Sequence, residues 1–309
     1  MTSVVAIIGA GMIGSSWSIV FARAGWTVFL WDQDGKARDN ALGAVRPSLH
    51  ELEVHGLIDG ADDVLAQISV TERLDEALGA AELVQECAPE DLEVKRALFA
   101  ELDATAPTGA ILASSTSGFP ASAFCDGLPG RQRCLVAHPV NPPHLLPLVE
   151  LVPAPWTNPA VLERTEAIMR AVGQTPIRVK REIDGFVLNR LQGALLNEAL
   201  RLVGAGIAST EDVDLAVSHG LGLRWSFMGP LETIDLNAPE GIADYARRYA
   251  PMYTAMAQCK NDSEPWSEGT IEAVTRARRA RLPLSRIADR QAWRDHRLLA
   301  LACRSLDDA

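Results

Sequence analysis

The chain has 309 residues, of which 48% are hydrophobic and 22% are charged, and its formal net charge is −11 at pH 7. This length allows two domains with a large core, and the negative charge argues against nucleic acid or an anionic membrane surface as the main partner. No apolar run reaches the length of about 18 residues that a membrane-spanning helix needs, so we expect no membrane partner.

The first predicted elements are a strand, a glycine-rich turn and a helix. The apolar run 4–8 predicts a buried strand, the apolar spacing of 12–24 predicts a helix, and Gly9-Ala10-Gly11-Met12-Ile13-Gly14 joins them. In such a turn the first glycine allows the tight bend, the second admits a pyrophosphate and the third lets helix and strand pack closely. A helix N-terminus also offers N–H groups to phosphates. We therefore assign the backbone of Gly9, Gly11, Met12, Ile13 and Gly14 to binding a dinucleotide.

A second strand is predicted at 26–31, and it ends at Asp32, 18 residues after the last glycine of the turn. This order of strand, turn, helix and acid is typical of NAD-binding domains. The Asp32 carboxylate would accept hydrogen bonds from the adenosine ribose and repel a 2′-phosphate, which predicts NAD rather than NADP as the cofactor. An ordinary glycine-rich turn without a ligand is the alternative.

Strand and helix signals then alternate as far as residue 183. Strands are predicted at 67–70, 82–87, 110–113, 134–137, 148–152 and 176–179, and helices at 35–55, 92–105 and 159–172. After residue 185 only helical spacing remains, and Ser209 and Asp212 have the spacing of a capping box. We expect an α/β fold, with a Rossmann-type doubly wound sheet in an NAD-binding domain over 1–184, followed by an all-helical substrate and dimerisation domain over 185–309.

His138 and Glu150 are the first candidates for chemistry. His138 ends one predicted strand and Glu150 lies in the next, so a hairpin would bring the carboxylate against the imidazole. The carboxylate would fix the ring tautomer and favour the imidazolium, as a base for oxidising a secondary alcohol requires. On spacing alone, His138 is also compatible with a structural role at a strand end.

Eight strings of the chain match one known family in order, and they cover most of residues 4–240. They lie at 9–14, 85–95, 114–117, 136–143, 147–153, 184–191, 220–225 and 228–233. The most specific are His138-Pro139-Val140-Asn141-Pro142-Pro143 and Asp184-Gly185-Phe186-Val187-Leu188-Asn189-Arg190-Leu191. The chain thereby resembles the 3-hydroxyacyl-CoA dehydrogenase superfamily, and more closely its L-gulonate 3-dehydrogenase (lambda-crystallin) branch.

The resemblance implies a catalytic dyad at His138 and Glu150. It also implies that Ser117 and Asn189 hold the substrate oxygen near the histidine. For Ser117 and Asn189, a plain capping or turn role is the alternative.

The resemblance implies further contacts and a partner. Asn141 would shape the loop around the dyad and the substrate, and Glu90 and Lys95 would contact NAD. For Glu90 and Lys95 the alternative is an exposed acid at a helix start and a solvated lysine. A homodimer formed through the helical domain is also implied.

The charge pattern favours a small free acid as the substrate. The segment 47–72, where acyl-CoA enzymes of the family hold part of the coenzyme A, has six acids and no Lys or Arg. Arg224, followed by Trp225, could hold a small carboxylate with its guanidinium, although a structural ion pair is the alternative. We expect a short 3-hydroxy acid, with L-gulonate ranked first.

Other functions stay open. L-carnitine ranks second as a substrate, because Trp225 could face a quaternary ammonium, and 3-hydroxybutyryl-CoA is a further alternative. A crystallin-like structural protein that binds NAD without turnover is the alternative from another class.

The remaining composition indicates the compartment. Five cysteines show no C-x-x-C pair, namely Cys87, Cys125, Cys134, Cys259 and Cys303. This pattern suggests no metal site and fits the reducing cytoplasm. Nine arginines lie in 276–304, which we interpret as a solvated helix face of the helical domain, at a dimer contact rather than a nucleic-acid site.

Overall fold

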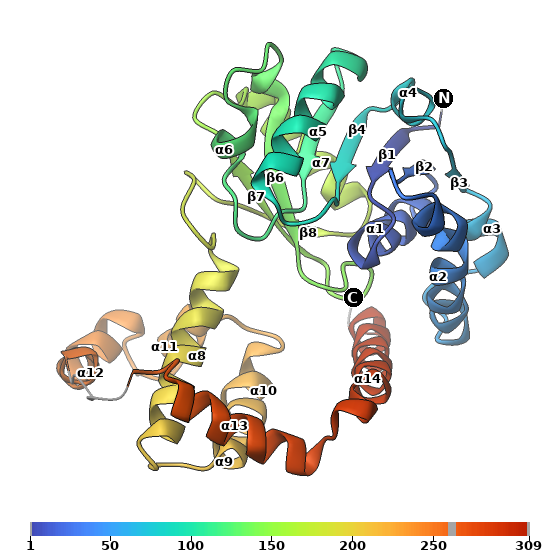
Figure 1. Cartoon of the computed structure of the whole chain (residues 1–309). Helices are drawn as coiled ribbons and strands as arrows, with labels where there is room; N and C mark the ends of the chain where they lie inside the picture. The colour runs from blue at the N-terminus through green and yellow to red at the C-terminus, as the bar shows by residue number, and fades with distance from the viewer. Residues whose placement is uncertain (1, 259–263, 308–309) are drawn as a thin grey trace. The chain divides into compact units, whose positions relative to one another are not determined.

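The computed structural model describes residues 2–258 and 264–307. The described chain forms two compact units (Figure 1). The first comprises the residues up to Arg190 together with the chain from Gln291 onward, and the second runs from Leu191 to Arg290. Within 2–258 and 264–307, every helix is too short or too polar to span a bilayer.

The first unit is built on one eight-stranded sheet in the order β3-β2-β1-β4-β5-β6-β7-β8. The strands are β1 (Val4–Ile8), β2 (Thr27–Trp31), β3 (Ile68–Val70), β4 (Leu83–Glu86), β5 (Ile111–Ser114), β6 (Cys134–Pro139), β7 (Leu148–Pro153) and β8 (Thr175–Arg178). Only β6 and β7 pair in antiparallel fashion. In such sheets a ligand binds beyond the carboxyl ends of the strands where the strand order reverses, here at β1 and β4.

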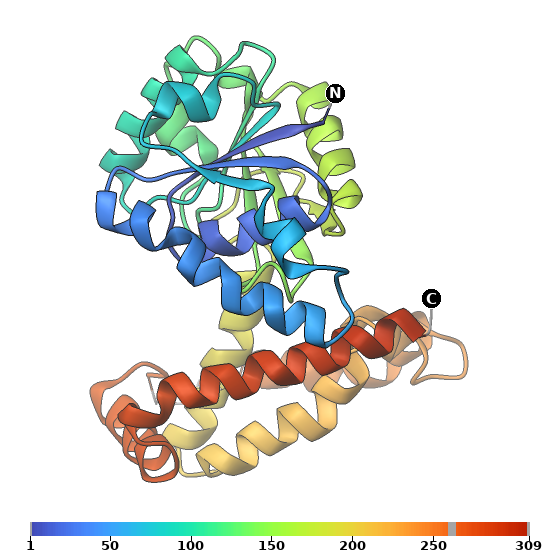
Figure 2. The same ribbon diagram turned by 90° about the vertical axis from the view of Figure 1, so that its right-hand side faces the viewer.

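Helices cover both faces of this sheet (Figures 1 and 2). They are α1 (Met12–Arg23), α2 (Gly35–Val54), α3 (Ala61–Leu65), α4 (Leu74–Leu78), α5 (Leu92–Thr105), α6 (Ala121–Cys125) and α7 (Pro159–Ala171). Because successive side chains of a strand point to opposite faces, β1 contributes Val5 and Ile7 to one core and Ala6 and Ile8 to the other. The predicted Rossmann-type doubly wound sheet is confirmed.

The second unit is helical, as predicted. It contains α8 (Leu188–Gly204, from Leu191), α9 (Thr210–Leu215), α10 (Gly222–Trp225), α11 (Pro230–Asp235), α12 (Ile242–Gln258) and α13 (Glu268–Arg281). The predicted capping box is present at the start of α9, where the side chains of Ser209 and Asp212 each accept the other's backbone N–H. A capping box satisfies amides that the helix itself leaves unpaired.

The last helix, α14 (Ile287–Asp307), belongs to the first unit from Gln291 onward. Leu299 is 1% exposed and lies in the core that includes Trp17 of α1 and Leu49 of α2. Cys303 also donates its Sγ–H to the carbonyl oxygen of His55 at 3.3 Å. The end of the arginine-rich segment therefore packs with the sheet-containing unit, although the sequence pattern assigns it to the helical domain.

Candidate active site

The glycine-rich turn lies between β1 and α1, where the strand order reverses. A Cβ atom at Gly9 would lie 2.7 Å from the carbonyl oxygen of Cys87, and one at Gly14 would lie 1.8 Å from that of Gly9. A Cβ at Gly11 would meet nothing within 4 Å. Gly9 and Gly14 are thus required by the packing, whereas Gly11 borders open space. No side chain caps the start of α1, so its first amides are available to a phosphate.

Asp32 lies at the carboxyl end of β2, beside this turn. Its Oδ2 accepts a hydrogen bond from the Ala10 amide at 2.7 Å, which fixes the carboxylate against the turn. A cavity of about 500 Å³ is lined by Gly9, Gly11, Trp31 and Asp32, and by Val94 and Leu98 of α5, among others. A largely apolar lining that includes the acid at the end of β2 is suited to the adenosine half of NAD.

The hairpin of β6 and β7 places His138 and Glu150 directly opposite each other. His138 Nδ1 lies 2.8 Å from Glu150 Oε2, a distance typical of charge-assisted hydrogen bonds. His138 is 6% exposed and Glu150 is fully buried. Because Nδ1 faces the carboxylate, the opposite ring nitrogen, Nε2, points away from it and can meet a substrate.

The second oxygen of Glu150 binds the start of α8. Glu150 Oε1 accepts hydrogen bonds from the amides of Val187 at 2.8 Å and Leu188 at 3.0 Å. Burial opposes ionisation of Glu150, but His138 and these two amides outweigh it and hold its pKa below the ordinary value of 4.5. The carboxylate is therefore an anion at neutral pH.

The backbone of Phe186 orients the amides of Val187 and Leu188, which follow it in the chain. The sequence pattern did not identify Phe186 as a site residue. Its backbone is left-handed, with φ of 48°, which is costly for a residue with a Cβ atom. Its ring is fully buried, with its centroid 5.6 Å from that of His138. The glycine before an aromatic residue, Gly185-Phe186, was the available signal for this turn.

Ser117 and Asn189 are brought together by the structure. Ser117 follows β5, and Asn189 lies in the first turn of α8, immediately after the amides that bind Glu150. Asn189 Nδ2 donates a hydrogen bond to the Ser117 carbonyl oxygen at 3.1 Å. The two predicted oxygen-binding residues are thus directly linked.

The other two predicted substrate-binding residues, Asn141 and Arg224, lie in different units of the structure. Asn141, in the loop between β6 and β7, contacts Met12 of the glycine-rich turn, with 3.3 Å between Nδ2 and Sδ. The dyad loop and the predicted coenzyme site are therefore adjacent. Arg224 lies in α10 of the second unit, and its contact with a substrate stays a prediction.

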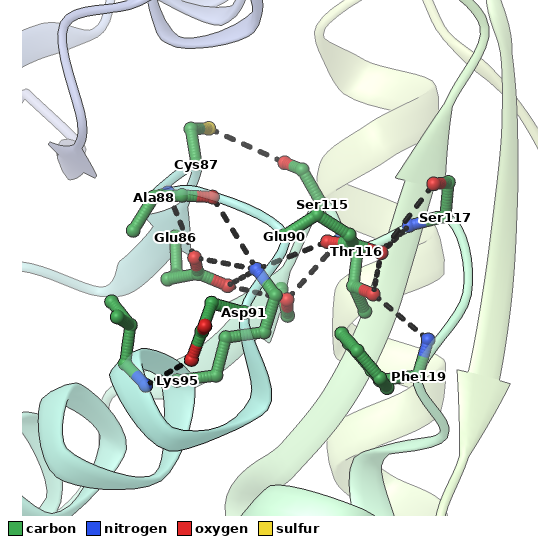
Figure 3. Close-up of polar contacts among 12 residues, drawn as sticks. Glu86, Cys87, Ala88, Glu90, Asp91, Lys95, Ser115, Thr116, Ser117 and Phe119 are labelled. Carbon is green, nitrogen blue, oxygen red and sulfur yellow. Dashed lines mark hydrogen bonds and ion pairs between the residues drawn. The ribbon is translucent and has the colours of Figure 1, made fainter.

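Glu90 and Lys95 lie in a cluster of charges beside Ser117 (Figure 3). Lys95 Nζ is 3.0 Å from Glu86 Oε1 and 3.4 Å from Glu90 Oε2. Lys95 is 1% exposed, so the alternative of a solvated lysine is wrong. The contact of Glu90 and Lys95 with NAD stays a prediction. Glu86 lies in the string 85–95, but its role was not predicted from the sequence, because its place at the end of a strand does not show that Lys95 pairs with it.

Metal ligands were not expected from the sequence. Over the described parts of the chain, no group of three or more His, Cys, Asp or Glu side chains lies where it could hold a metal ion.

Comparisons with known proteins identify the family of the chain. Residues 4–183 match the NAD-binding domain of 3-hydroxyacyl-CoA dehydrogenase, and residues 185–277 match its C-terminal domain. The chain is 47% identical to a lambda-crystallin homolog of Bos taurus, over 96% of this chain and 94% of that protein. It is 39% identical to an L-carnitine dehydrogenase of Streptomyces griseus, over 88% of this chain and 78% of that protein.

A solved structure is similar over almost the whole length. It is that of 5-formyl-3-hydroxy-2-methylpyridine 4-carboxylic acid 5-dehydrogenase, with a TM-score of 0.84 and 25% identity, covering 98% of each chain. The predicted resemblance to the lambda-crystallin branch is confirmed. The chain belongs to the 3-hydroxyacyl-CoA dehydrogenase family and is one of its NAD-dependent oxidoreductases.

Proposed function

We propose that this enzyme oxidises the 3-hydroxyl of a short free hydroxy acid to a 3-oxo acid, and that L-gulonate, converted to 3-dehydro-L-gulonate, is its substrate. The observation that carries the reaction is the 2.8 Å contact between the His138 imidazole and the buried Glu150 carboxylate. Oxidation of a secondary alcohol needs a base for the hydroxyl proton. Bound NAD supplies the acceptor for the hydride.

In this mechanism His138 Nε2 takes the hydroxyl proton as the hydride leaves the carbon. The imidazolium that forms is stabilised by Glu150, which is anionic because its pKa is lowered. Ser117 and Asn189 hold the reacting oxygen, and their direct hydrogen bond supports a shared position. Asn141 shapes the loop beside His138.

The coenzyme would be held by the turn after β1. The amides of Gly11, Met12 and Ile13 would bind the pyrophosphate at the start of α1. Gly9 and Gly14 permit the close packing that brings the turn to this position. The cavity beside Asp32 would take the adenosine. We retain the proposal that residues 1–184 bind NAD and that residues 185–309 serve the substrate and the dimer.

Asp32→Ala is expected to lower kcat/KM for NAD by roughly 10- to 100-fold, because the ribose hydroxyls lose a charged acceptor. The kcat/KM for NADP should stay unchanged or rise, since the carboxylate no longer repels the 2′-phosphate. Asp34→Ala is the matched control, because this neighbouring carboxylate caps α2 through the Lys36 amide and does not line the cavity. Steady-state kinetics with both coenzymes measure the effect. An unchanged preference for NAD in Asp32→Ala would contradict the assignment.

The substrate assignment rests on charge and on the family branch. The segment 47–72 offers no Lys or Arg to the phosphates of a coenzyme A ester. Arg224 is the proposed partner of the substrate carboxylate. The similarity to a lambda-crystallin homolog at 47% identity supports the branch whose members act on L-gulonate.

L-carnitine is the second candidate, because an L-carnitine dehydrogenase is 39% identical to this chain. In that case Trp225, which is 40% exposed, would face the trimethylammonium group through a cation–π contact. The two acids differ in the charge at the end remote from the carboxylate. Trp225→Leu would therefore weaken oxidation of L-carnitine more than that of L-gulonate.

The test is NADH formation with L-gulonate, L-carnitine, 3-hydroxybutyrate and 3-hydroxybutyryl-CoA under one set of conditions. We expect the largest kcat/KM with L-gulonate. Turnover of the coenzyme A ester alone would overturn the substrate proposal while leaving the dehydrogenase assignment intact.

We also propose that the enzyme is a homodimer joined through its helical unit. Of the described residues between Leu191 and Arg290, the buried ones are Thr233, Asp244 and Thr270, so the interior of this unit is not apolar. Its large apolar side chains include Phe227, which is 74% exposed, and Met256, which is 58% exposed. Exposed apolar surface on this scale is typical of an interface.

The double variant Met252→Glu/Met256→Glu on α12 is expected to weaken the dimer, raising its dissociation constant about 100-fold or more. Light scattering after size exclusion at micromolar concentration would then give the mass of one chain for the variant and of two chains for the wild type. Val54→Glu, at a residue of α2 that is 82% exposed, is the control and should remain a dimer. A monomeric wild type would refute the proposal.

A cytoplasmic location is proposed on the basis of the scattered cysteines. Of these, Cys87, Cys125, Cys134 and Cys303 are free thiols in the structure, and Cys259 lies outside the described residues. Free thiols are typical of proteins in a reducing compartment.

A further inference from the structure

Two buried charges and one exposed charge connect the wall of the coenzyme cavity to the loop that carries Ser117 (Figure 3). They are Glu86 at the end of β4, Glu90 in the loop that follows, and Lys95 in α5. The side chains of Glu86 and Lys95 are 0% and 1% exposed. Burial of a charge is unfavourable unless the charge is paired and hydrogen-bonded, and Glu86 and Lys95 meet this condition by pairing with each other.

The two oxygens of Glu90 have different partners. Oε1 accepts hydrogen bonds from the Thr116 hydroxyl at 2.6 Å and from the amides of Ser117 and Gly118, each at 3.0 Å. Oε2 lies 3.4 Å from Lys95 Nζ. Partial burial opposes ionisation, but Thr116, Lys95 and the two amides hold the pKa of Glu90 below its ordinary value. An anion is thus fixed under three successive residues of the loop.

Lys95 is itself held in place by Glu86. Its ammonium lies 3.0 and 3.2 Å from the two carboxylate oxygens of Glu86. Glu86 also accepts hydrogen bonds from the Ser114 hydroxyl and, at 2.8 Å, from the Ala88 amide. Ala88 lines the cavity proposed for the adenosine. Lys95 Nζ therefore contacts Glu90, whose carboxylate binds the loop, and also donates a hydrogen bond at 3.4 Å to the carbonyl oxygen of Ala88 in the cavity wall.

We propose that Glu90 is a positioning residue for Ser117, and that the buried Glu86–Lys95 pair orients Glu90 for this task. The inference rests on the proposed function, in which Ser117 and Asn189 hold the reacting oxygen. Glu90 fixes the Ser117 backbone, and the Ser117 carbonyl accepts the hydrogen bond from Asn189. One carboxylate thereby sets the position of both oxygen-binding side chains.

Glu90→Gln tests the first step. The amide keeps one oxygen but presents an NH₂ group either to Lys95 or to the loop donors, so one set of contacts is lost. We expect kcat to fall about 10- to 100-fold, as a displacement near 1 Å can cause. In contrast to the NAD contact that the family resemblance implies for Glu90, the NADH dissociation constant, from fluorescence titration, should change by less than about threefold. Glu93→Gln is the matched control, since this nearby carboxylate in the first turn of α5 is 80% exposed.

Two further measurements separate positioning from a general loss of structure. Amide hydrogen exchange of Ser117 and Gly118 should accelerate at least about tenfold in Glu90→Gln, while exchange of the amides in the preceding strand β5 should stay unchanged. In the double variant Glu90→Gln/Ser117→Ala, kcat should fall by much less than the product of the two fold-losses measured for the single variants, because both changes act through Ser117. Additive effects, or unchanged exchange of these two amides, would overturn the proposal.

The role of the ion pair is tested by removing both charges. Lys95→Met alone leaves Glu86 buried without its cation and can prevent folding. In Glu86→Gln/Lys95→Met the amide oxygen can accept from the Ala88 amide, while the NH₂ group can donate to the Ser114 hydroxyl oxygen. This variant should show the same faster exchange at Ser117 and Gly118. Retained protection in this variant would refute the orienting role. Exchange needs no substrate, so it reports on the inference even if no hydroxy acid is turned over.

A different outcome would assign Glu90 to the coenzyme instead. If Glu90→Gln weakens NADH binding more than about tenfold and leaves the loop amides protected, Glu90 contacts NAD directly and positions nothing.

Discussion

His138→Ala is expected to lower kcat for oxidation of the hydroxy acid by about 10²- to 10⁴-fold, the usual contribution of a general base. The change removes the acceptor of the hydroxyl proton and leaves the coenzyme site intact. Glu150 keeps the Val187 and Leu188 amides as partners, so its buried charge is not stranded. Initial rates of NADH formation measure the loss, and NADH titration should show an unchanged dissociation constant.

Removal of a second histidine distinguishes this role from a structural one, because that change should leave kcat unchanged. His144→Ala is the control, because burial and the neighbouring Arg23 lower the pKa of His144 to about 4 and keep it neutral in the assay range. Full turnover by His138→Ala would refute the mechanism.

The features that the sequence predicts well are local. The strand, turn and helix over Val4–Arg23 follow from apolar spacing, and the glycines follow from steric contacts within a few ångströms. The hairpin of His138 and Glu150 was predictable too, because two strands joined by a short loop pair with their neighbours in register. In each case the residues that make the feature lie close together along the chain.

The contacts that complete the site were not predictable, because they join distant segments through the backbone. The amides on Glu150 come from residues 37 and 38 positions away, and an amide leaves no trace in the sequence. Glu90 meets the Ser117 amide 27 positions away for the same reason. Packing of α14 against the sheet-containing unit depends on Leu299, whose helical spacing does not specify the core that buries it.

Glu150→Gln is expected to lower kcat by about 10³- to 10⁴-fold, with a smaller loss of stability than Glu150→Ala. The amide oxygen can still accept hydrogen bonds from Val187 and Leu188, so the start of α8 keeps its acceptor. The amide NH₂ then faces His138 Nδ1 and donates to it. That donation places the ring proton on Nε2, where a base must be free, and it removes the anion that stabilises the imidazolium.

Glu150→Ala separates the chemistry from the folding. It leaves His138 and the amides of Val187 and Leu188 without their acceptor, so thermal unfolding should show a stability loss of about 3 kcal/mol or more in addition to lost activity. The lowered pKa of Glu150 also makes the folding stability depend on pH. The stabilisation from its ionised form is complete well above 4.5 and is lost as the pH falls from there through the lower folded-state pKa, so the stability gap between wild type and Glu150→Gln should narrow over that range. A Glu150→Gln enzyme with normal kcat would mean that the carboxylate only holds the start of α8, and that the tautomer of His138 is fixed by another group.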